Sequence, residues 1–248
     1  MKLEWMDDQQ QMNTAAATIV SDLLAKKPDA TIALPTGNTP LGLYRTLAAL
    51  KQAGKFSCPE ASFFNLDEFS GKSSDDPQSY GAFLRKHVFE PLAVDEGRIR
   101  LLRGDAPNLQ AECMAFEAAI EGRGGLDLAI LGLGQNGHIA FNEPGSDWGA
   151  GTRQVRLAST TRKAQAMIYA SDDDVPTYGL TMGIPTIVSA RAILLLVSGS
   201  GKQAALAALL RGVPDPERSV TALLSHSALT VLADKALRPG DHACSGWS

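Results

Sequence analysis

The most constraining feature of this sequence is a set of short segments that are apolar at nearly every position and alternate with helix-like stretches. These apolar segments span residues 30–35, 61–69, 126–134, 192–197 and 228–234. Strands that are apolar on both faces are typical of parallel sheets whose two faces are covered by helices. The sequence therefore predicts an α/β fold with a doubly wound, mostly parallel sheet and helices on both faces.

Helical spacing of apolar residues fills the stretches between these segments. We expect helices over residues 13–27, 40–52, 79–92, 108–125 and 201–212. Asn13 is expected to cap the first helix, Pro40 suits the first turn of the second, and Gly212 is expected to end the last. With no internal repeat or long linker, the 248 residues are predicted to form one domain. Within it, 144–177 is expected to form a flap and 240–248 a disordered tail.

Composition and charge argue against several classes of protein. The formal net charge is -4 and the chain has no basic run, which argues against nucleic-acid binding. The polar first ten residues do not resemble a signal peptide, and the apolar segments are shorter than the ~20 residues of a membrane span. The three cysteines are widely spaced without a CxxC pair, so reduced thiols are expected. We therefore expect a cytoplasmic protein without membrane contact.

Two strand-to-helix junctions have features of an anion site. In the first, Thr36-Gly37-Asn38-Thr39 follows an apolar segment and opens a helix, whose free N–H groups suit a phosphate. The glycine spacing matches neither a P-loop nor a dinucleotide fingerprint, and a plain turn is the alternative. In the second, Lys202 lies at the start of a helix, where its charge opposes the helix dipole. A bound anion would resolve that conflict, whereas a solvent-facing lysine is the alternative.

Acidic and imidazole side chains follow two other apolar segments. Asp67 and Glu68 end the segment FFNLDEF, where they are either two solvated acids or include a proton-transfer base. His138 lies in GQNGHIAFNEPGS, with Asn136 two residues before it and Glu143 five residues after it. A carboxylate beside an imidazole fixes its tautomer and increases its basicity, which indicates a catalytic pair. No other histidine has usable spacing for a metal, so no metal is predicted.

Taken together, these motifs resemble the glucosamine-6-phosphate deaminase/isomerase family from about Ile19 to Asp234. The matching segments are LPTGNTPLGLY, FFNLDEF, DDPQSYGAFL, GGLDLAILGLGQNGHIAFNEPGS, TYGLTMGIPTI, LLLVSGSGKQAAL and LSHSALTVLAD. The related 6-phosphogluconolactonases share the Gly-His pair but typically continue His-Thr-Ala-Ser-Leu-Phe-Pro. Here the chain continues His-Ile-Ala-Phe-Asn-Glu-Pro from residue 138, which is the deaminase form.

The resemblance implies a doubly wound α/β fold and a reaction without cofactor or metal. An amino-sugar 6-phosphate and water would give a ketose 6-phosphate and ammonia. His138, held by Asn136 and Glu143, would open the sugar ring, and Asp67 would move a proton from C2 to C1. The family's phosphate cradle matches Thr36, Gly37, Asn38, Thr39 and Lys202.

Two departures from the family pattern affect these expectations. Met167 stands where the family commonly has an arginine that binds the substrate phosphate, and a local shift would let Arg162 or Lys163 replace it. Val155 replaces a lysine typical of allosteric members, although Arg153 is kept, so we expect a non-allosteric enzyme. We also expect a monomer or small homo-oligomer. Trp148 is expected either to cap the substrate or to pack the flap.

Other functions remain open at this point. The first alternative is a galactosamine-6-phosphate deaminase, because the sequence does not decide between the two amino sugars. The second is a 6-phosphogluconolactonase, which would not need the carboxylate of Asp67 as a proton shuttle. The third is a sugar-phosphate sensor that has lost turnover, for which the Met167 departure is the best support.

Overall fold

The computed structural model describes residues 1–165, 169 and 174–239, and it is built around a parallel sheet. The seven strands lie in the order β1-β10-β9-β6-β2-β3-β5, and neighbouring strands all pair in parallel. Their bounds, in that order, are Lys2–Met6, Leu229–Asp234, Ala192–Val197, Leu128–Gly132, Thr31–Leu34, Ser62–Asn65 and Ile99–Arg100. The predicted mostly parallel α/β fold is confirmed.

The order of the strands reverses between β2 and β6. From β2 the chain builds outward through β3 to β5, and it then returns to the other side of β2 with β6, β9 and β10. In open α/β sheets, ligands bind outside the carboxyl ends of the strands at such a switch point. The segments that follow β2 and β6 are Thr36–Thr39 and the loop of His138, so the fold brings two of the predicted motifs to this edge.

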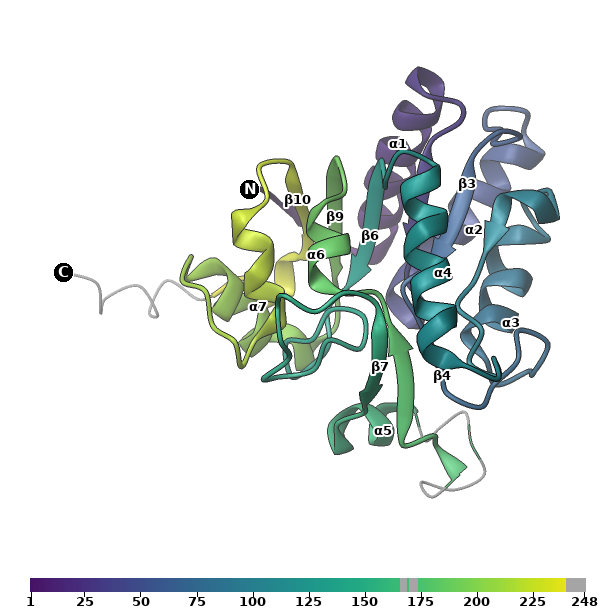
Figure 1. Ribbon diagram of the computed structural model, residues 1–248. Coiled ribbons are helices and arrows are strands. Elements are labelled where there is room, and N and C mark those ends of the chain that lie inside the picture. The colour runs from purple at the N-terminus through teal and green to yellow at the C-terminus, as the bar shows by residue number, and fades with distance from the viewer. Residues whose placement is uncertain (166–168, 170–173, 240–248) are drawn as a thin grey trace.

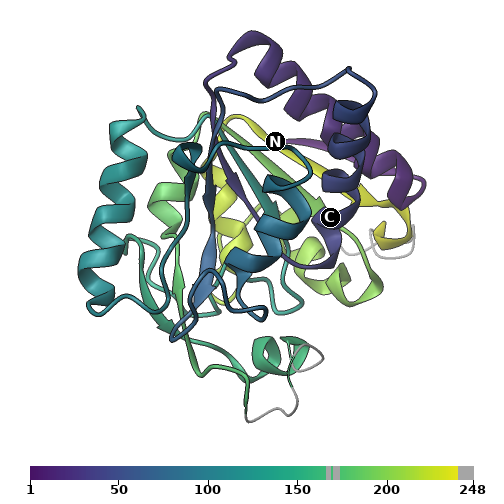
Figure 2. The same cartoon turned by 90° about the vertical axis from the view of Figure 1, so that its right-hand side faces the viewer.

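Helices cover both faces of the sheet. Along β2, Ile32 and Leu34 pack in one apolar cluster and Ala33 packs in the other, because successive side chains of a strand point to opposite faces. The first cluster includes residues of α1 (Gln9–Lys26), α2 (Asn38–Gln52) and α3 (Tyr80–Leu84), and the second those of α4 (Leu109–Gly122), α6 (Ile184–Val188) and α7 (Gln203–Leu210). Figure 2 shows the teal α4 and the purple α1 on opposite sides of the sheet.

A second, antiparallel sheet lies beyond the carboxyl ends of the central strands. It contains β4 (Asp67–Phe69), β8 (Tyr178–Thr181) and β7 (Arg153–Arg156). The short helix α5 (Ser159–Gln165) follows β7 along the chain, as Figure 1 shows. The predicted continuous strand 61–69 is therefore wrong, because the chain leaves the main sheet at Leu66. The buried Asn65 holds this bend: its amide donates to the Asp67 carbonyl over 2.8 Å and accepts from the Leu102 N–H over 2.8 Å.

The first helix begins earlier than the sequence predicts. Helix α1 starts at Gln9, and the carboxylate of Asp8 caps it by accepting from the Gln11 N–H over 2.7 Å. The predicted cap at Asn13 is wrong, since Asn13 lies inside the helix and packs against Gly42 of α2. A methyl group at Gly42 would lie 2.0 Å from the Asn13 amide nitrogen, which explains how the two helices approach closely.

Other predicted elements are confirmed, several of them with different bounds. The segment 79–92 forms α3 and then a π-helical turn over Arg85–Phe89, and α7 is preceded by a 3₁₀ turn over Ser200–Lys202. Pro40 does lie in the first turn of α2, and Gly212 follows α7 with a φ of 71°. The short strands β1, β5, β7 and β8 were not predicted. The predicted tail 240–248 lies outside the described residues.

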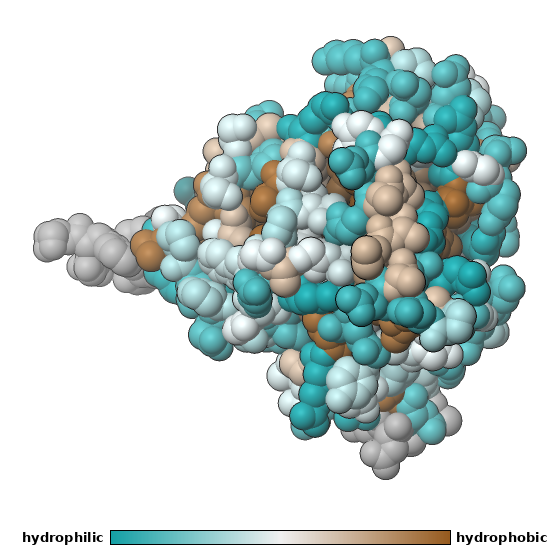
Figure 3. All heavy atoms as spheres, in the orientation of Figure 1, coloured by the Kyte–Doolittle hydropathy of each residue, from teal (hydrophilic) through white to brown (hydrophobic). Residues whose placement is uncertain are grey.

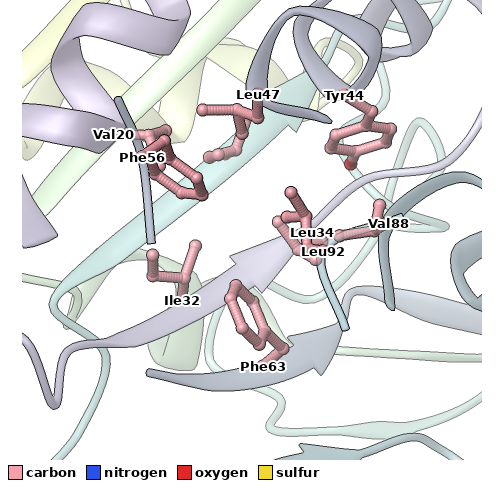
Figure 4. Close-up of a pocket in the computed structure, with 10 residues that line it drawn as sticks. Val20, Ile32, Leu34, Tyr44, Leu47, Phe56, Phe63, Val88 and Leu92 are labelled. Atoms are coloured by element: carbon pink, nitrogen blue, oxygen red, sulfur yellow. The ribbon is translucent and has the colours of Figure 1, made fainter. Parts of the chain in front are cut away.

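The layer between the sheet and helices α1 and α2 contains a small apolar cavity. Figure 4 shows its lining side chains, which include Val20 of α1, Ile32 of β2, Leu47 of α2 and Phe63 of β3. The hydroxyl of Tyr44, also in the lining, donates to the Pro35 carbonyl over 2.6 Å. The polar side chains that the sequence singled out do not line this cavity, so we interpret it as a packing gap in the core.

A buried carboxylate bonds three separate segments of the chain at the amino ends of the central strands. Asp127, just before β6, accepts from the Lys27 ammonium over 2.8 Å, the Arg191 guanidinium over 2.9 Å and the Thr31 N–H over 2.9 Å. Burial opposes ionisation of Asp127, but these partners outweigh it and lower its pKa. This network lies at the edge opposite the switch-point loops and stabilises the fold there.

The surface seen in Figure 3 is mostly polar, and hydrophobic residues show only in separate small areas of that face. Among the helices built from described residues, none combines the length and the apolar character needed to cross a membrane.

Candidate active site

The loop after β6 holds an imidazole, an amide and a carboxylate in direct contact. Nδ1 of His138 lies 3.2 Å from Oε2 of Glu143, and the Asn136 amide donates to the same oxygen over 2.8 Å. The side-chain oxygen of Asn136 also accepts from the His138 N–H over 3.2 Å. The structure therefore brings together the three residues of GQNGHIAFNEPGS that the sequence singled out.

The backbone of this loop is folded tightly around the ring. The Gly134 N–H donates to the His138 carbonyl over 2.9 Å, and Gly137 turns the chain with a φ of 89°. A methyl group at Gly134 would lie 2.4 Å from the imidazole, so glycine is required there for space. Ala140 has a φ of 49°, an unusual conformation for a residue with a side chain.

Glu143 is ionised in this arrangement. Burial alone would raise the pKa of Glu143, but hydrogen bonds from His138, Thr161 and Asn136, together with the positive charge that His138 carries when it is protonated, lower it to about 2. An ionised carboxylate only accepts hydrogen bonds, so it favours the tautomer of His138 with the proton on Nδ1. That tautomer leaves Nε2 unprotonated and able to act as a base.

Asp67, at the start of β4, is buried in the same region. Its pKa is raised well above the ordinary value, first by burial and then by the negative charges of Glu68 and Glu143. Asp67 pairs with Thr181 of β8, whose hydroxyl accepts from the Phe141 N–H over 3.1 Å, so Asp67 lies near the loop of His138. A carboxyl group with a raised pKa holds a proton more strongly than an ordinary carboxyl group, which suits it to carry a proton between two atoms of a substrate.

Glu68 has a different role from its neighbour. Its carboxylate accepts from the Phe69 N–H over 2.8 Å, the Tyr80 N–H over 3.0 Å and the Gly81 N–H over 2.8 Å. It is 1% exposed, so the alternative of two solvated acids is wrong. Burial raises the pKa of Glu68 to about 7, although the three backbone donors act to lower it. Glu68 anchors the start of α3.

The two predicted anion-binding segments meet at the same edge. The Ser198 hydroxyl at the end of β9 lies 3.3 Å from the Thr39 hydroxyl in the first turn of α2. Helices α2 and α7 both begin without a side-chain hydrogen bond at the cap, so no capping side chain competes with a ligand for their first N–H groups. Lys202 is half-buried, and burial lowers its pKa. A phosphate would satisfy the helix N-termini and the ammonium together.

Two residues that the sequence reasoning missed complete the site. Tyr80 is buried at the start of α3, and its pKa is raised first by burial and then by the negative charge of Asp67, which indicates that the two side chains lie close together. Thr161 of α5 places its hydroxyl 3.3 Å from Nδ1 of His138. The motif DDPQSYGAFL contains Tyr80, but its spacing alone carries no signal that the ring would turn toward the site.

Residues of the predicted flap have the following positions. Met167, the site of the family departure, lies outside the described residues. The Arg162 guanidinium donates to the Val175 carbonyl over 3.1 Å, and Lys163 is exposed. Trp148 is partly buried and packs against the core cluster of the face that α4 covers, which supports packing over capping. Arg153 donates to the side chain of Asn142 over 3.1 Å.

Within the described parts of the chain, no group of three or more His, Cys, Asp and Glu side chains is placed to hold a metal ion. The fold and this site are typical of a doubly wound α/β enzyme, in which a His–carboxylate pair, a separate buried carboxyl and the two predicted anion-binding segments lie at the switch point.

Comparison with known proteins places the chain in one family. Residues 7–231 match the family described as glucosamine-6-phosphate isomerases/6-phosphogluconolactonase, and the chain belongs to it. It is 40% identical over 242 residues to glucosamine-6-phosphate deaminase 1 of Bacillus subtilis (strain 168), covering 96% of this chain and 100% of that protein. It is 37% identical to glucosamine-6-phosphate deaminase of Bacillus pumilus (strain SAFR-032), covering 95% and 98%.

Solved structures agree with this assignment. A structure described as a monomeric glucosamine-6-phosphate deaminase superposes with a TM-score of 0.93 at 40% identity, covering 96% of this chain and 100% of that one. The 6-phosphogluconolactonase of Thermotoga maritima superposes with a TM-score of 0.72 at 23% identity, covering 94% and 98%, and shows the shared fold.

Proposed function

We propose that this chain is a glucosamine-6-phosphate deaminase, which converts glucosamine 6-phosphate and water to fructose 6-phosphate and ammonia. The observation that carries the proposal is that one edge of the sheet holds two carboxyl groups whose pKa values are shifted in opposite directions. Glu143 is ionised beside His138, while the buried Asp67 has a raised pKa. The near full-length relatives named as glucosamine-6-phosphate deaminases support the choice of substrate.

In the first step, His138 opens the sugar ring. The unprotonated Nε2 takes the proton of the anomeric hydroxyl, the C1–O5 bond breaks to leave an aldehyde at C1, and the imidazolium returns the proton to O5. Glu143 accepts from Nδ1 over 3.2 Å and stabilises the transient imidazolium. Asn136 fixes the carboxylate and, through its side-chain oxygen, the backbone of His138.

In the second step, Asp67 isomerises the open chain. Its carboxylate removes the proton from C2 while the aldehyde oxygen gains one proton from the ammonium group on C2, which gives an enolamine. The same side chain then delivers the C2 proton to C1 to give a protonated ketimine. Water adds to C2 of the ketimine and ammonia leaves, so the net reaction consumes one water and releases one ammonia. The raised pKa of Asp67 suits both halves of this transfer.

The phosphate is held by Thr36, Gly37, Asn38, Thr39 and Lys202. The N-terminus of α2 and the half-buried ammonium of Lys202 face the same edge, joined through the contact between Ser198 and Thr39. We further propose that the enzyme is monomeric, non-allosteric and cytoplasmic, which the similarity to a monomeric deaminase and the buried free thiols of Cys58 and Cys113 support.

Ammonia release from glucosamine 6-phosphate and from galactosamine 6-phosphate tests the proposal directly. We expect rapid release from the first, hyperbolic kinetics with and without N-acetylglucosamine 6-phosphate, and a monomer by light scattering. No ammonia from either sugar would overturn the deaminase assignment. A parallel assay of 6-phosphogluconolactone hydrolysis, with the Asp67→Asn variant as control, separates the lactonase alternative, because a lactonase would survive that change.

A further inference from the structure

Thr161 lies where the flap meets the ring-opening pair. It is 4% exposed in helix α5, and its hydroxyl lies 3.3 Å from Nδ1 of His138. Hydrogen bonding from the same hydroxyl is also one of the effects that lower the pKa of Glu143. Just before the helix, the Ala158 N–H donates to Oε1 of Glu143 over 3.2 Å. Ala158 and Thr161 both belong to the predicted flap, residues 144–177. Each of them therefore contributes a donor to Glu143, the acid that pairs with His138 in the loop after β6.

These contacts saturate Glu143. An ionised carboxylate has about four acceptor positions. The described structure offers it four donors, which are the ring of His138, the amide of Asn136, the N–H of Ala158 and the hydroxyl of Thr161. Because Nδ1 of His138 carries a proton, the proton of the Thr161 hydroxyl is directed to the carboxylate, and its oxygen is left facing Nδ1.

The number of donors decides how a carboxylate acts on an imidazole. A carboxylate with few other donors concentrates its charge on the ring and stabilises the imidazolium strongly. A carboxylate whose charge is shared among several donors still orients the ring but stabilises the imidazolium less. Ring opening needs a His138 ring whose Nε2 carries no proton, so sharing the charge favours the form of the ring that the reaction uses.

We propose that Thr161 is a positioning residue, whose hydroxyl donates to Glu143 and thereby holds His138 as the Nδ1-protonated, neutral base. This inference rests on the ring-opening role given to His138 in the proposed function. Other charged groups near the pair are Asp67 of β4, which interacts electrostatically with Glu143, and Arg218, whose side chain packs against Gly137. The Thr160 hydroxyl lies 3.3 Å from the Asn136 amide.

Thr161→Val, Thr161→Ser and Thr177→Val test the kinetic consequence. Thr177 is an exposed threonine just before β8 and controls for the change of threonine to valine. For Thr161→Val we expect kcat to fall about tenfold at neutral pH with little change in KM, since a hydrogen bond to a charged group is lost. The acid limb of kcat/KM should move to higher pH. Thr161→Ser keeps the hydroxyl and should therefore show the kcat and the acid limb of the unaltered protein. Thr177→Val should also match the unaltered protein.

Nitrogen-15 NMR of the histidine rings tests the same inference without using activity. The chain has four histidines, and the signal of His138 is assigned with His138→Gln. In the unaltered protein we expect a neutral ring protonated on Nδ1, whereas Thr161→Val should show more imidazolium at the same pH. An unchanged tautomer, titration and acid limb in Thr161→Val would overturn the proposal. A protein that releases no ammonia but shows these NMR changes would instead overturn only the deaminase assignment.

Discussion

The α-carbon of Gly134 faces the imidazole of His138 so closely that a methyl group on it would lie 2.4 Å from Nε2. We therefore expect Gly134→Ala to displace the ring and reduce kcat about a hundredfold, because misplacing a catalytic group by about 1 Å has effects of this size. Steady-state kinetics measures the loss. Gly122→Ala is the matched control, since a methyl group there meets no atom within 4 Å. Equal activity of the two variants would contradict the tight fit.

Asp67→Asn should lower activity but raise the stability of the folded chain. The buried carboxyl of Asp67 is disfavoured in its ionised form by burial and by two neighbouring acids. Its replacement by an amide should raise the melting temperature at pH 8 while reducing ammonia release by about three orders of magnitude or more, because the proton shuttle is lost. A calorimetric scan and an ammonia assay on one preparation measure both. A lower melting temperature would show that the carboxylate is well compensated.

Glu68 should make the folded state less stable as the pH rises. Its pKa is raised by burial to about 7 from an ordinary value of 4.5, so between these values the folded chain binds more protons than the unfolded chain. The free energy of unfolding therefore falls as pH rises from about 4.5 to about 7. Urea denaturation across this range measures the slope. Glu68→Gln should reduce the slope and lower stability overall, since three backbone N–H groups lose a carboxylate acceptor.

Lys202→Met should impair substrate binding more than chemistry. Its half-buried ammonium has a lowered pKa because of burial, and a bound phosphate would compensate for that cost. We expect KM to rise by about a hundredfold with a smaller change in kcat, and competitive inhibition by inorganic phosphate to weaken in parallel. Lys55→Met, which alters an exposed lysine just after α2, is the control. An unaltered KM in Lys202→Met would contradict the prediction that Lys202 binds the substrate phosphate.

Asp127→Asn should lower stability and leave catalysis unchanged. The carboxylate bonds Lys27, Arg191 and the Thr31 N–H at the amino ends of the strands, away from the switch-point loops. We expect a loss of about 2 kcal/mol, or roughly 4–8 °C in melting temperature for a chain of this size. Thermal denaturation and kinetics measured together check this. A drop in kcat/KM at temperatures well below unfolding would show that the two edges are coupled.

The sequence predicted the parts of the fold that depend on local pattern. Apolar runs such as 192–197 coincide with a strand, since burial on both faces leaves a continuous apolar signal. The short strands β5 and β7 escaped prediction because partners distant in sequence, rather than their own composition, determine their pairing. The bend at Leu66 also depends on a distant contact, from the side chain of Asn65 to Leu102.

The difference between local sequence pattern and contacts made by residues distant in sequence also applies to the site. His138, Asn136 and Glu143 were predicted to lie together because one loop carries all of them, and the structure places them in contact. Thr161 was missed because it approaches from another element, 23 residues along the chain. Glu68 could not be told from Asp67 by sequence, since its partners are backbone N–H groups of α3.

The break at Leu66 has a mechanical consequence. It places Asp67 in the three-stranded sheet with β7 and β8, while Thr36–Thr39 and Lys202 extend from the seven-stranded sheet. A sugar phosphate whose phosphate rests on the large sheet and whose C2 meets Asp67 would span both sheets. The substrate would then act as a crosslink between two bodies of the molecule, and a ligand that offers phosphate alone would leave that crosslink unmade.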